Sequence, residues 1–154
     1  FYNPISQFIV RATNPPLVRL RRFIPGLWGV DLAALALLIT MEVLRISLTA
    51  MLLGHSPRWT GIIFLSLGEL AKLAVYTIIF SIFIHALLSW FSNGLQHPMT
   101  RLLGSFTDPI LQPVRRILPA TGGIDLSPLV VFIAMMLILK LVVQPLLDLG
   151  RALL

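Results

Sequence analysis

The sequence predicts an all-α, polytopic helical membrane protein, and its composition, three long apolar stretches and an internal repeat lead to that prediction. Of the 154 residues, 57% are hydrophobic and only 12% are charged, whereas a soluble domain carries about 25% charged residues. A mean hydropathy of +0.93 does not suit a small globule, because a short chain leaves much of its surface facing water. The bilayer is therefore the expected solvent.

Three apolar stretches are long enough to cross a membrane. A helix needs about 20 residues to span a hydrocarbon core of about 30 Å. We expect spans at residues 32–53, 61–91 and 126–147. The middle stretch is longer than a crossing requires, so this helix must tilt or protrude.

Two segments rich in proline and arginine, residues 1–30 and 92–125, separate these spans and predict interfacial helices. In the second segment we expect two short amphipathic helices within 97–119, with Thr107-Asp108 as the N-cap of the second and Pro109 at its first position. Pro119 is expected to end that helix. Its basic side favours a position at the membrane interface, and a re-entrant or protein-covered hairpin is the alternative.

A shift of 94 positions superimposes the first basic segment on the second. The matched residues keep one register without a gap, and they include Pro4 with Pro98, Thr13 with Thr107, Asn14 with Asp108, Leu17 with Leu111, Arg21-Arg22 with Arg115-Arg116, and Asp31 with Asp125. We expect a first repeat at 1–53 and a second at 61–154. Two crossings separate the copies, so the repeats are expected to be parallel.

The register of the repeat also predicts a segment before the first residue. The second copy follows a span, whereas the chain begins at Phe1 without a methionine. We therefore expect a missing N-terminal helix and four spans in the intact protein. The positive-inside rule orients the molecule. Seven arginines lie on the face with both repeats and two on the other, which predicts cytoplasmic repeats and a C-terminus on the opposite side.

Two aspartates each precede a span and each follow an arginine pair. Asp31 and Asp125 are placed to cap the helices that they precede, since a carboxylate there accepts hydrogen bonds from free N–H groups. We also expect each aspartate to pair with the arginines of its own copy. The arginines, Arg21, Arg22, Arg115 and Arg116, are expected to contact anionic lipid or, as the alternative, an acidic partner.

Five charged residues fall within the apolar stretches, where an ionisable group is costly. They are Glu42, Arg45, Glu69, Lys72 and Lys140. The first four form two pairs three residues apart, which predicts ion pairs along each helix. Lys140 has no such neighbour, so we expect it to reach Glu42 or Glu69, or an acid on another subunit or protein. A structural ion-pair network is the preferred interpretation over an ion or proton path.

No pattern of residues predicts catalysis. The three histidines, His55, His85 and His97, do not share the spacing of metal ligands, and the chain has no cysteine. His85 is expected to form a hydrogen bond at a helix contact. We expect no enzyme activity, no metal and no cofactor. Direct nucleic-acid binding is not expected either, because no basic face interleaved with aromatic residues is present.

The motif Asp108-Pro109, Arg115-Arg116-Ile117-Leu118-Pro119, Gly122-Gly123-Ile124-Asp125-Leu126-Ser127-Pro128 resembles the YggT family, called YlmG in Gram-positive bacteria. The first copy departs from this motif, with Trp28 in place of Gly122 and Ala33-Ala34 in place of Ser127-Pro128. The resemblance implies a multi-pass protein of the bacterial inner membrane, in which the orientation predicted from the arginines places the C-terminus in the periplasm. It also implies a connection with osmotic-shock tolerance and with envelope or division processes. Plastid members of the family are linked to cytochrome complex assembly.

Two functions from different classes follow from these features. The first is a non-catalytic scaffold or accessory subunit of a larger membrane complex, whose basic interfacial helices contact anionic lipid or a partner. The second is a small oligomeric channel or transport component in osmotic or potassium homeostasis. Both imply association with another membrane protein or with further copies of the chain.

Overall fold

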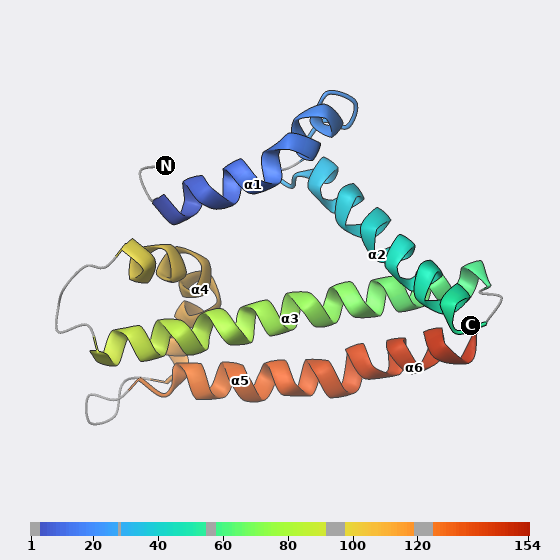
Figure 1. Cartoon of the computed structure of the whole chain (residues 1–154). Helices are drawn as coiled ribbons and strands as arrows, with labels where there is room; N and C mark the ends of the chain where they lie inside the picture. The colour runs from blue at the N-terminus through green and yellow to red at the C-terminus, as the bar shows by residue number, and fades with distance from the viewer. Residues whose placement is uncertain (1–3, 28, 55–57, 92–97, 119–124) are drawn as a thin grey trace. The chain divides into compact units, whose positions relative to one another are not determined.

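The computed structural model describes residues 4–27, 29–54, 58–91, 98–118 and 125–154. In these residues the regular structure is helical, which confirms the all-α prediction. The elements are α1 (Pro4–Arg21), α2 (Leu32–Leu52), α3 (Trp59–Phe91), α4 (Pro98–Ile117), α5 (Ser127–Ile138), a π-helical segment η1 (Leu139–Val143) and α6 (Gln144–Ala152) (Figure 1).

Three helical stretches have the length and composition to cross a membrane, as the sequence predicts: Leu32–Leu52, Trp59–Leu88 and Ser127–Ala152. In each, only 11% of the apolar window is buried, so most apolar side chains point outwards, as a lipid environment requires. The third of these stretches, Ser127–Ala152, continues past the end that was expected at residue 147. The reason is local, since Gln144 and Arg151 both donate hydrogen bonds to Asp148 along α6 and keep its polar residues within the helix.

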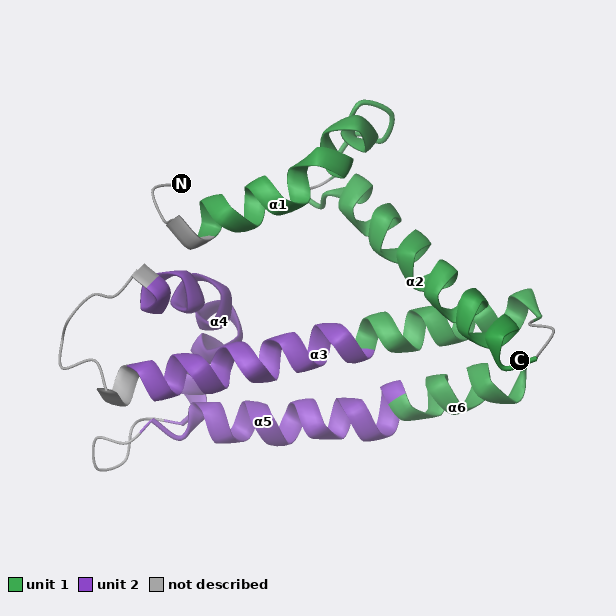
Figure 2. Ribbon diagram, viewed as in Figure 1, with its two compact units in different colours: residues 1–71, 144–154 green, residues 72–143 purple. Residues whose placement is uncertain are grey.

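The chain forms two compact units, residues 1–71 with 144–154 and residues 72–143 (Figure 2). We call them unit 1 and unit 2. This division differs from the two expected repeats, because the beginning of α3 packs with α6 in unit 1. Glycines allow that contact: a Cβ atom at Gly150 would lie 2.7 Å from the backbone nitrogen of Leu65, and one at Gly61 would lie 2.8 Å from the backbone of Leu153. Small residues commonly allow such close approach of membrane helices.

Unit 2 is built around three buried side chains, Ile82 of α3, Leu111 of α4 and Val131 of α5. In this unit α4 is one continuous helix that passes through Pro109 and Pro113, so the prediction of two short helices is wrong. Proline lacks the N–H group that would bond the preceding turn, and the helix bends instead of ending (Figure 1).

The expected cap at Thr107-Asp108 is therefore also wrong. Thr107 is completely buried inside α4, and its hydroxyl donates to the carbonyl oxygen of Leu103 at 2.9 Å. Tertiary packing of this turn favours continuation of the helix over a new N-terminus. Pro119, the expected end of the helix, lies outside the described residues, as do the two glycines at 122 and 123.

Candidate functional site

The first candidate site joins the end of α1 to the beginning of α2, and we call Asn14, Arg21 and Asp31 the first elbow. The Nε of Arg21 donates to Oδ2 of Asp31 at 2.9 Å, and Nη1 donates to Oδ1 of Asn14 at 3.3 Å. The other oxygen of Asp31 accepts the backbone N–H of Ala34 at 3.1 Å, which caps α2. One carboxylate thus holds the end of α1 and the beginning of α2 together.

The second elbow, Asp108, Arg115 and Asp125, joins α4 to α5. The Nε of Arg115 donates to Oδ2 of Asp125 at 2.8 Å, and Nη1 donates to Oδ1 of Asp108 at 3.3 Å. Oδ1 of Asp125 accepts the backbone N–H of Ser127 at 2.9 Å. The arrangement differs from the expected cap by one residue, because Leu126 is the N-cap of α5 and Asp125 precedes it.

The side-chain contacts of the two elbows correspond when the numbering is shifted by 94, but the backbone contacts do not. Asp31 accepts from the N–H of Ala34, whose equivalent is Pro128, whereas Asp125 accepts from the N–H of Ser127. The aspartate partner, the arginine and the group bonded through Nη1 are equivalent, except that Asn14 stands where the second elbow has Asp108. Burial matches as well, since Leu17 and Leu111 are both buried. The equivalent threonines differ, because Thr13 is exposed and Thr107 is buried.

Both elbow aspartates are held in their charged form. The hydrogen bond from Arg21, followed by the backbone N–H of Ala34, lowers the pKa of Asp31 below its ordinary value. Partial burial of Asp125 acts in the opposite direction, but the hydrogen bonds from Ser127 and Arg115 outweigh burial and lower the pKa of that carboxyl too.

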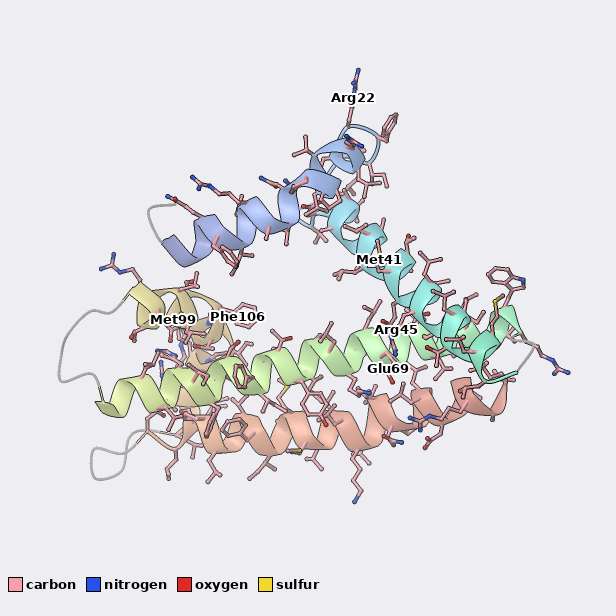
Figure 3. All side chains as sticks on the ribbon, in the orientation of Figure 1. Arg22, Met41, Arg45, Glu69, Met99 and Phe106 are labelled. Carbon is pink, nitrogen blue, oxygen red and sulfur yellow. The ribbon has the colours of Figure 1, made fainter. Side chains whose placement is uncertain are left out.

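The second arginine of each pair is not part of the elbow. Arg22 and Arg116 are exposed, and their side chains have no hydrogen bond or ion pair with any residue that the structure describes. Figure 3 shows the side chain of Arg22 extending outwards from the turn that follows α1. Within each pair, one guanidinium thus joins the elbow and the other stays exposed.

Three of the intramembrane charges gather in unit 1. The Nε of Arg45 lies 3.0 and 3.1 Å from the two carboxylate oxygens of Glu42, as the spacing of three residues predicts. Glu69 of α3 faces Arg45 (Figure 3) and adds a second electrostatic attraction. Arg45, Glu69 and Arg151 line a cavity of about 410 Å³. The sequence did not single out Arg151 here, because this residue was expected beyond the end of the span.

The two intramembrane lysines lie in unit 2. Lys72 is half-buried on α3, three residues after Glu69, and their pairing stays a prediction. Lys140 lies in the π-helical segment, is exposed, and makes no hydrogen bond or ion pair with a described residue of unit 2. Short π segments within α-helices are uncommon and often occur at functional positions. The expected contact of Lys140 with Glu42, Glu69 or an acid on another chain stays a prediction.

His85 joins α3 to α4, which confirms the expected hydrogen bond at a helix contact. Its Nδ1 lies 2.7 Å from Oγ1 of Thr107. His85 also lines a second cavity, of about 430 Å³, together with Arg115 and Asp125 of the second elbow. His55 and His97 lie outside the described residues. Among the residues that the structure describes, no group of three His, Asp or Glu side chains is placed to hold a metal ion.

Three lipid-length apolar helices, two of which are joined to basic segments by arginine–aspartate elbows, define a polytopic helical membrane protein. Comparison with known families gives a match to the CCB3/YggT model at residues 1–52 and 64–146. The chain therefore belongs to the CCB3/YggT family, which confirms the resemblance seen in its sequence.

Curated relatives from three organisms match most of the chain. An uncharacterized protein, PA0392, of Pseudomonas aeruginosa is 40% identical over 94% of this chain and 74% of its own length. An uncharacterized protein in the proC 3′ region of Vibrio alginolyticus is 39% identical over 88% of this chain and 74% of its own length. Uncharacterized protein YggT of Escherichia coli K12 is 35% identical over 90% of this chain and 71% of its own length. No solved structure matches the chain.

Proposed function

We propose that this protein is a non-catalytic scaffold or accessory subunit of a larger assembly in the bacterial inner membrane. The observation that carries the proposal is the equivalence of the two elbows. Each elbow ties a basic segment to the first turn of a span through an arginine–aspartate pair, Arg21 with Asp31 and Arg115 with Asp125. Two such segments, held in the same way, offer a repeated basic surface to anionic lipid or to a partner.

The proposal includes a parallel internal repeat, with both basic segments in the cytoplasm and the C-terminus in the periplasm. The exposed guanidiniums of Arg22 and Arg116 support it, since a cation near an anionic leaflet gains about 1 kcal/mol. The many outward-facing apolar side chains of the spans suit lipid, a second copy of the chain or another membrane protein. We propose that the protein acts in the response of the cell to osmotic stress.

The topology is tested by labelling single cysteines, because the chain has no cysteine of its own. Arg22→Cys and Arg116→Cys replace exposed side chains that make no described contact, and Leu53→Cys lies just beyond the far end of α2. In inverted vesicles a membrane-impermeant maleimide should label the first two variants, and in spheroplasts it should label the third. Labelling of the first two from opposite sides would contradict the parallel arrangement.

The scaffold role is tested by photo-cross-linking in native membranes. A photoreactive residue at position 22 or 116 should give discrete protein adducts or lipid adducts, whereas the same residue at the exposed position 52 reports on contacts at the other end of α2. Identical adducts at all three positions would mean that the basic segments select no partner.

The charged cavity of unit 1 favours a second candidate function, a small oligomeric channel or transport component. Arg45, Glu69 and Arg151 bring charges from three helices to one cavity. The test is ion flux into liposomes that contain the purified protein, compared with the variants Glu69→Gln and Lys140→Met. Flux that depends on these charges would support transport, and absence of flux from the wild-type protein would exclude this function.

A further inference from the structure

The cavity of unit 2 combines a polar rim with an apolar wall. It has a volume of about 430 Å³, within the range of about 300–1,000 Å³ that is usual for small-molecule sites. His85, Arg115 and Asp125 supply its polar groups, and aliphatic and aromatic side chains from α3, α4 and α5 supply the rest, among them Leu111, Leu129 and Phe132. The same cavity therefore suits a molecule with a polar head and an apolar tail.

The hydrogen bond to Thr107 determines which nitrogen of His85 carries a proton. Thr107 has a single hydroxyl proton, and it is donated to the carbonyl oxygen of Leu103 at 2.9 Å. Oγ1 of Thr107 must therefore accept from Nδ1–H of His85, at 2.7 Å. In the neutral ring Nε2 is then an acceptor. Thr107 is fully buried, so water does not replace this contact.

Arg115 retains hydrogen-bonding capacity after it has formed the elbow. A guanidinium has five N–H donors, and Nε and one Nη1 donor are directed to Asp125 and Asp108. The two N–H groups of Nη2 have no partner among the residues that the structure describes, and the side chain is 41% exposed. A phosphate oxygen can accept from such free, charged guanidinium donors.

At the rim one guanidinium lies beside two carboxylates, which restricts the headgroup that the cavity can accept. Asp125 lies 2.8 Å from Nε of Arg115, and Asp108 adds a second carboxylate at 3.3 Å from Nη1. A headgroup with only negative charge would be repelled by both carboxylates. A zwitterionic headgroup places its phosphate on Arg115 and its cation beside Asp125, and a cation with N–H donors also satisfies the acceptors of Asp125 and His85.

We infer that the cavity of unit 2 binds one aminophospholipid, with its phosphate on Arg115, its ammonium group beside Asp125 and His85, and the adjoining part of an acyl chain along Leu129 and Phe132. This inference rests on the proposed function, in which the basic segments lie at the membrane surface and contact lipid. It adds the class of lipid that binds at the second elbow. The bilayer supplies the ligand at that depth.

The first elbow provides a matched control within the same chain. Arg21 makes the equivalent contacts with Asn14 and Asp31, but it lines neither of the two cavities described above. Arg21→Gln removes the same kind of ion pair as Arg115→Gln and leaves the unit 2 cavity intact. A lipid effect confined to Arg115→Gln therefore separates binding from loss of an elbow.

The test is native mass spectrometry of the purified full chain in mild detergent, titrated with phosphatidylethanolamine, phosphatidylcholine or phosphatidylglycerol. The wild-type protein should retain one phosphatidylethanolamine roughly tenfold more tightly than phosphatidylcholine, which has the same charges but lacks N–H donors. Arg115→Gln should remove this preference, and Arg21→Gln should preserve it. Leu129→Trp fills the cavity from a position that is 56% exposed, keeps every charge, and should also abolish retention.

Several outcomes would overturn the inference. Equal retention of the ethanolamine and choline lipids, tighter retention of phosphatidylglycerol, or equal loss in Arg21→Gln would each do so. Competition by millimolar inorganic phosphate would show a simple anion site instead of a lipid site. Because headgroup preference is measured in detergent, it is independent of the cysteine labelling, so failure of the proposed topology and failure of this site are distinguishable.

Discussion

Arg21 donates two hydrogen bonds to the same oxygen of Asp31, from Nε at 2.9 Å and from Nη2 at 2.5 Å. The other oxygen of Asp31 accepts from the backbone at the beginning of α2. The pair is therefore a joint between a basic segment and a membrane span, and Arg115 with Asp125 forms the equivalent joint in unit 2.

Loss of both elbow carboxylates should destabilise the protein. The double variant Asp31→Ala/Asp125→Ala removes two ion pairs and the backbone hydrogen bonds at the beginning of two helices. We expect the Tm in detergent to fall by a few degrees, since partly exposed ion pairs contribute little by themselves and the lost backbone contacts add to them. Arg22→Gln is the control, and a melting curve unchanged in the double variant would show that the elbows do not support the fold.

Acid should weaken the same joints. Both aspartates have a pKa below the ordinary value of about 3.9, so their contribution to stability is fully present above about pH 4. It is lost as the pH falls through the lowered pKa of the folded state. The Tm should therefore decrease below pH 4 in the wild-type protein and less steeply in Asp31→Asn/Asp125→Asn. Asp148→Asn leaves the elbows intact and should keep the wild-type slope.

The buried threonine of the second repeat should matter more than its exposed equivalent in the first. Thr107→Val leaves Nδ1 of the half-buried His85 without its acceptor, which costs about 1–3 kcal/mol. Thr13→Val removes only a hydroxyl that donates to its own helix, at the carbonyl oxygen of Ile9. Thermal unfolding of the two variants in detergent compares them directly, and equal Tm values would contradict the role assigned to the His85 contact.

A methyl group should not be tolerated where α6 meets α3. In Gly150→Ala the new Cβ would lie 2.7 Å from the backbone nitrogen of Leu65, and a backbone atom cannot move aside as a side chain can. We expect a loss of about 1–3 kcal/mol from overpacking. Gly104→Ala is the control, because its Cβ would lie 3.5 Å from the nearest atom, Oδ2 of Asp108. Destabilisation of both variants to the same extent would show that helix flexibility, and not contact, is responsible.

The spans and the elbow pairs could be predicted from the sequence because local spacing determines them. The length of an apolar stretch can be read directly from the sequence, and the stretch at residues 32–53 corresponds to α2 at Leu32–Leu52. A separation of ten residues between Arg21 and Asp31 brings them together once the intervening chain turns back. Glu42 and Arg45 lie on one helix at a spacing that requires no knowledge of the rest of the fold.

Other features depend on neighbours that are distant in the sequence. Proline and a possible cap at Thr107-Asp108 predicted two short helices, but contacts of α4 with α3 and α5 around Leu111 favour one bent helix. Gly150 lies against Leu65, and His85 forms a hydrogen bond with Thr107. Neither contact can be predicted from the spacing of the two residues in the sequence.

The amino-acid sequence by itself determined the class of protein, the three spans and the two arginine–aspartate joints, because hydrocarbon thickness and short-range pairing act on contiguous residues. Only the tertiary structure decided the continuity of α4, the close contact of α6 with α3, and the two cavities with their polar rims. These depend on which side chains meet across helices, where excluded volume and buried hydrogen bonds outweigh the preferences of each segment.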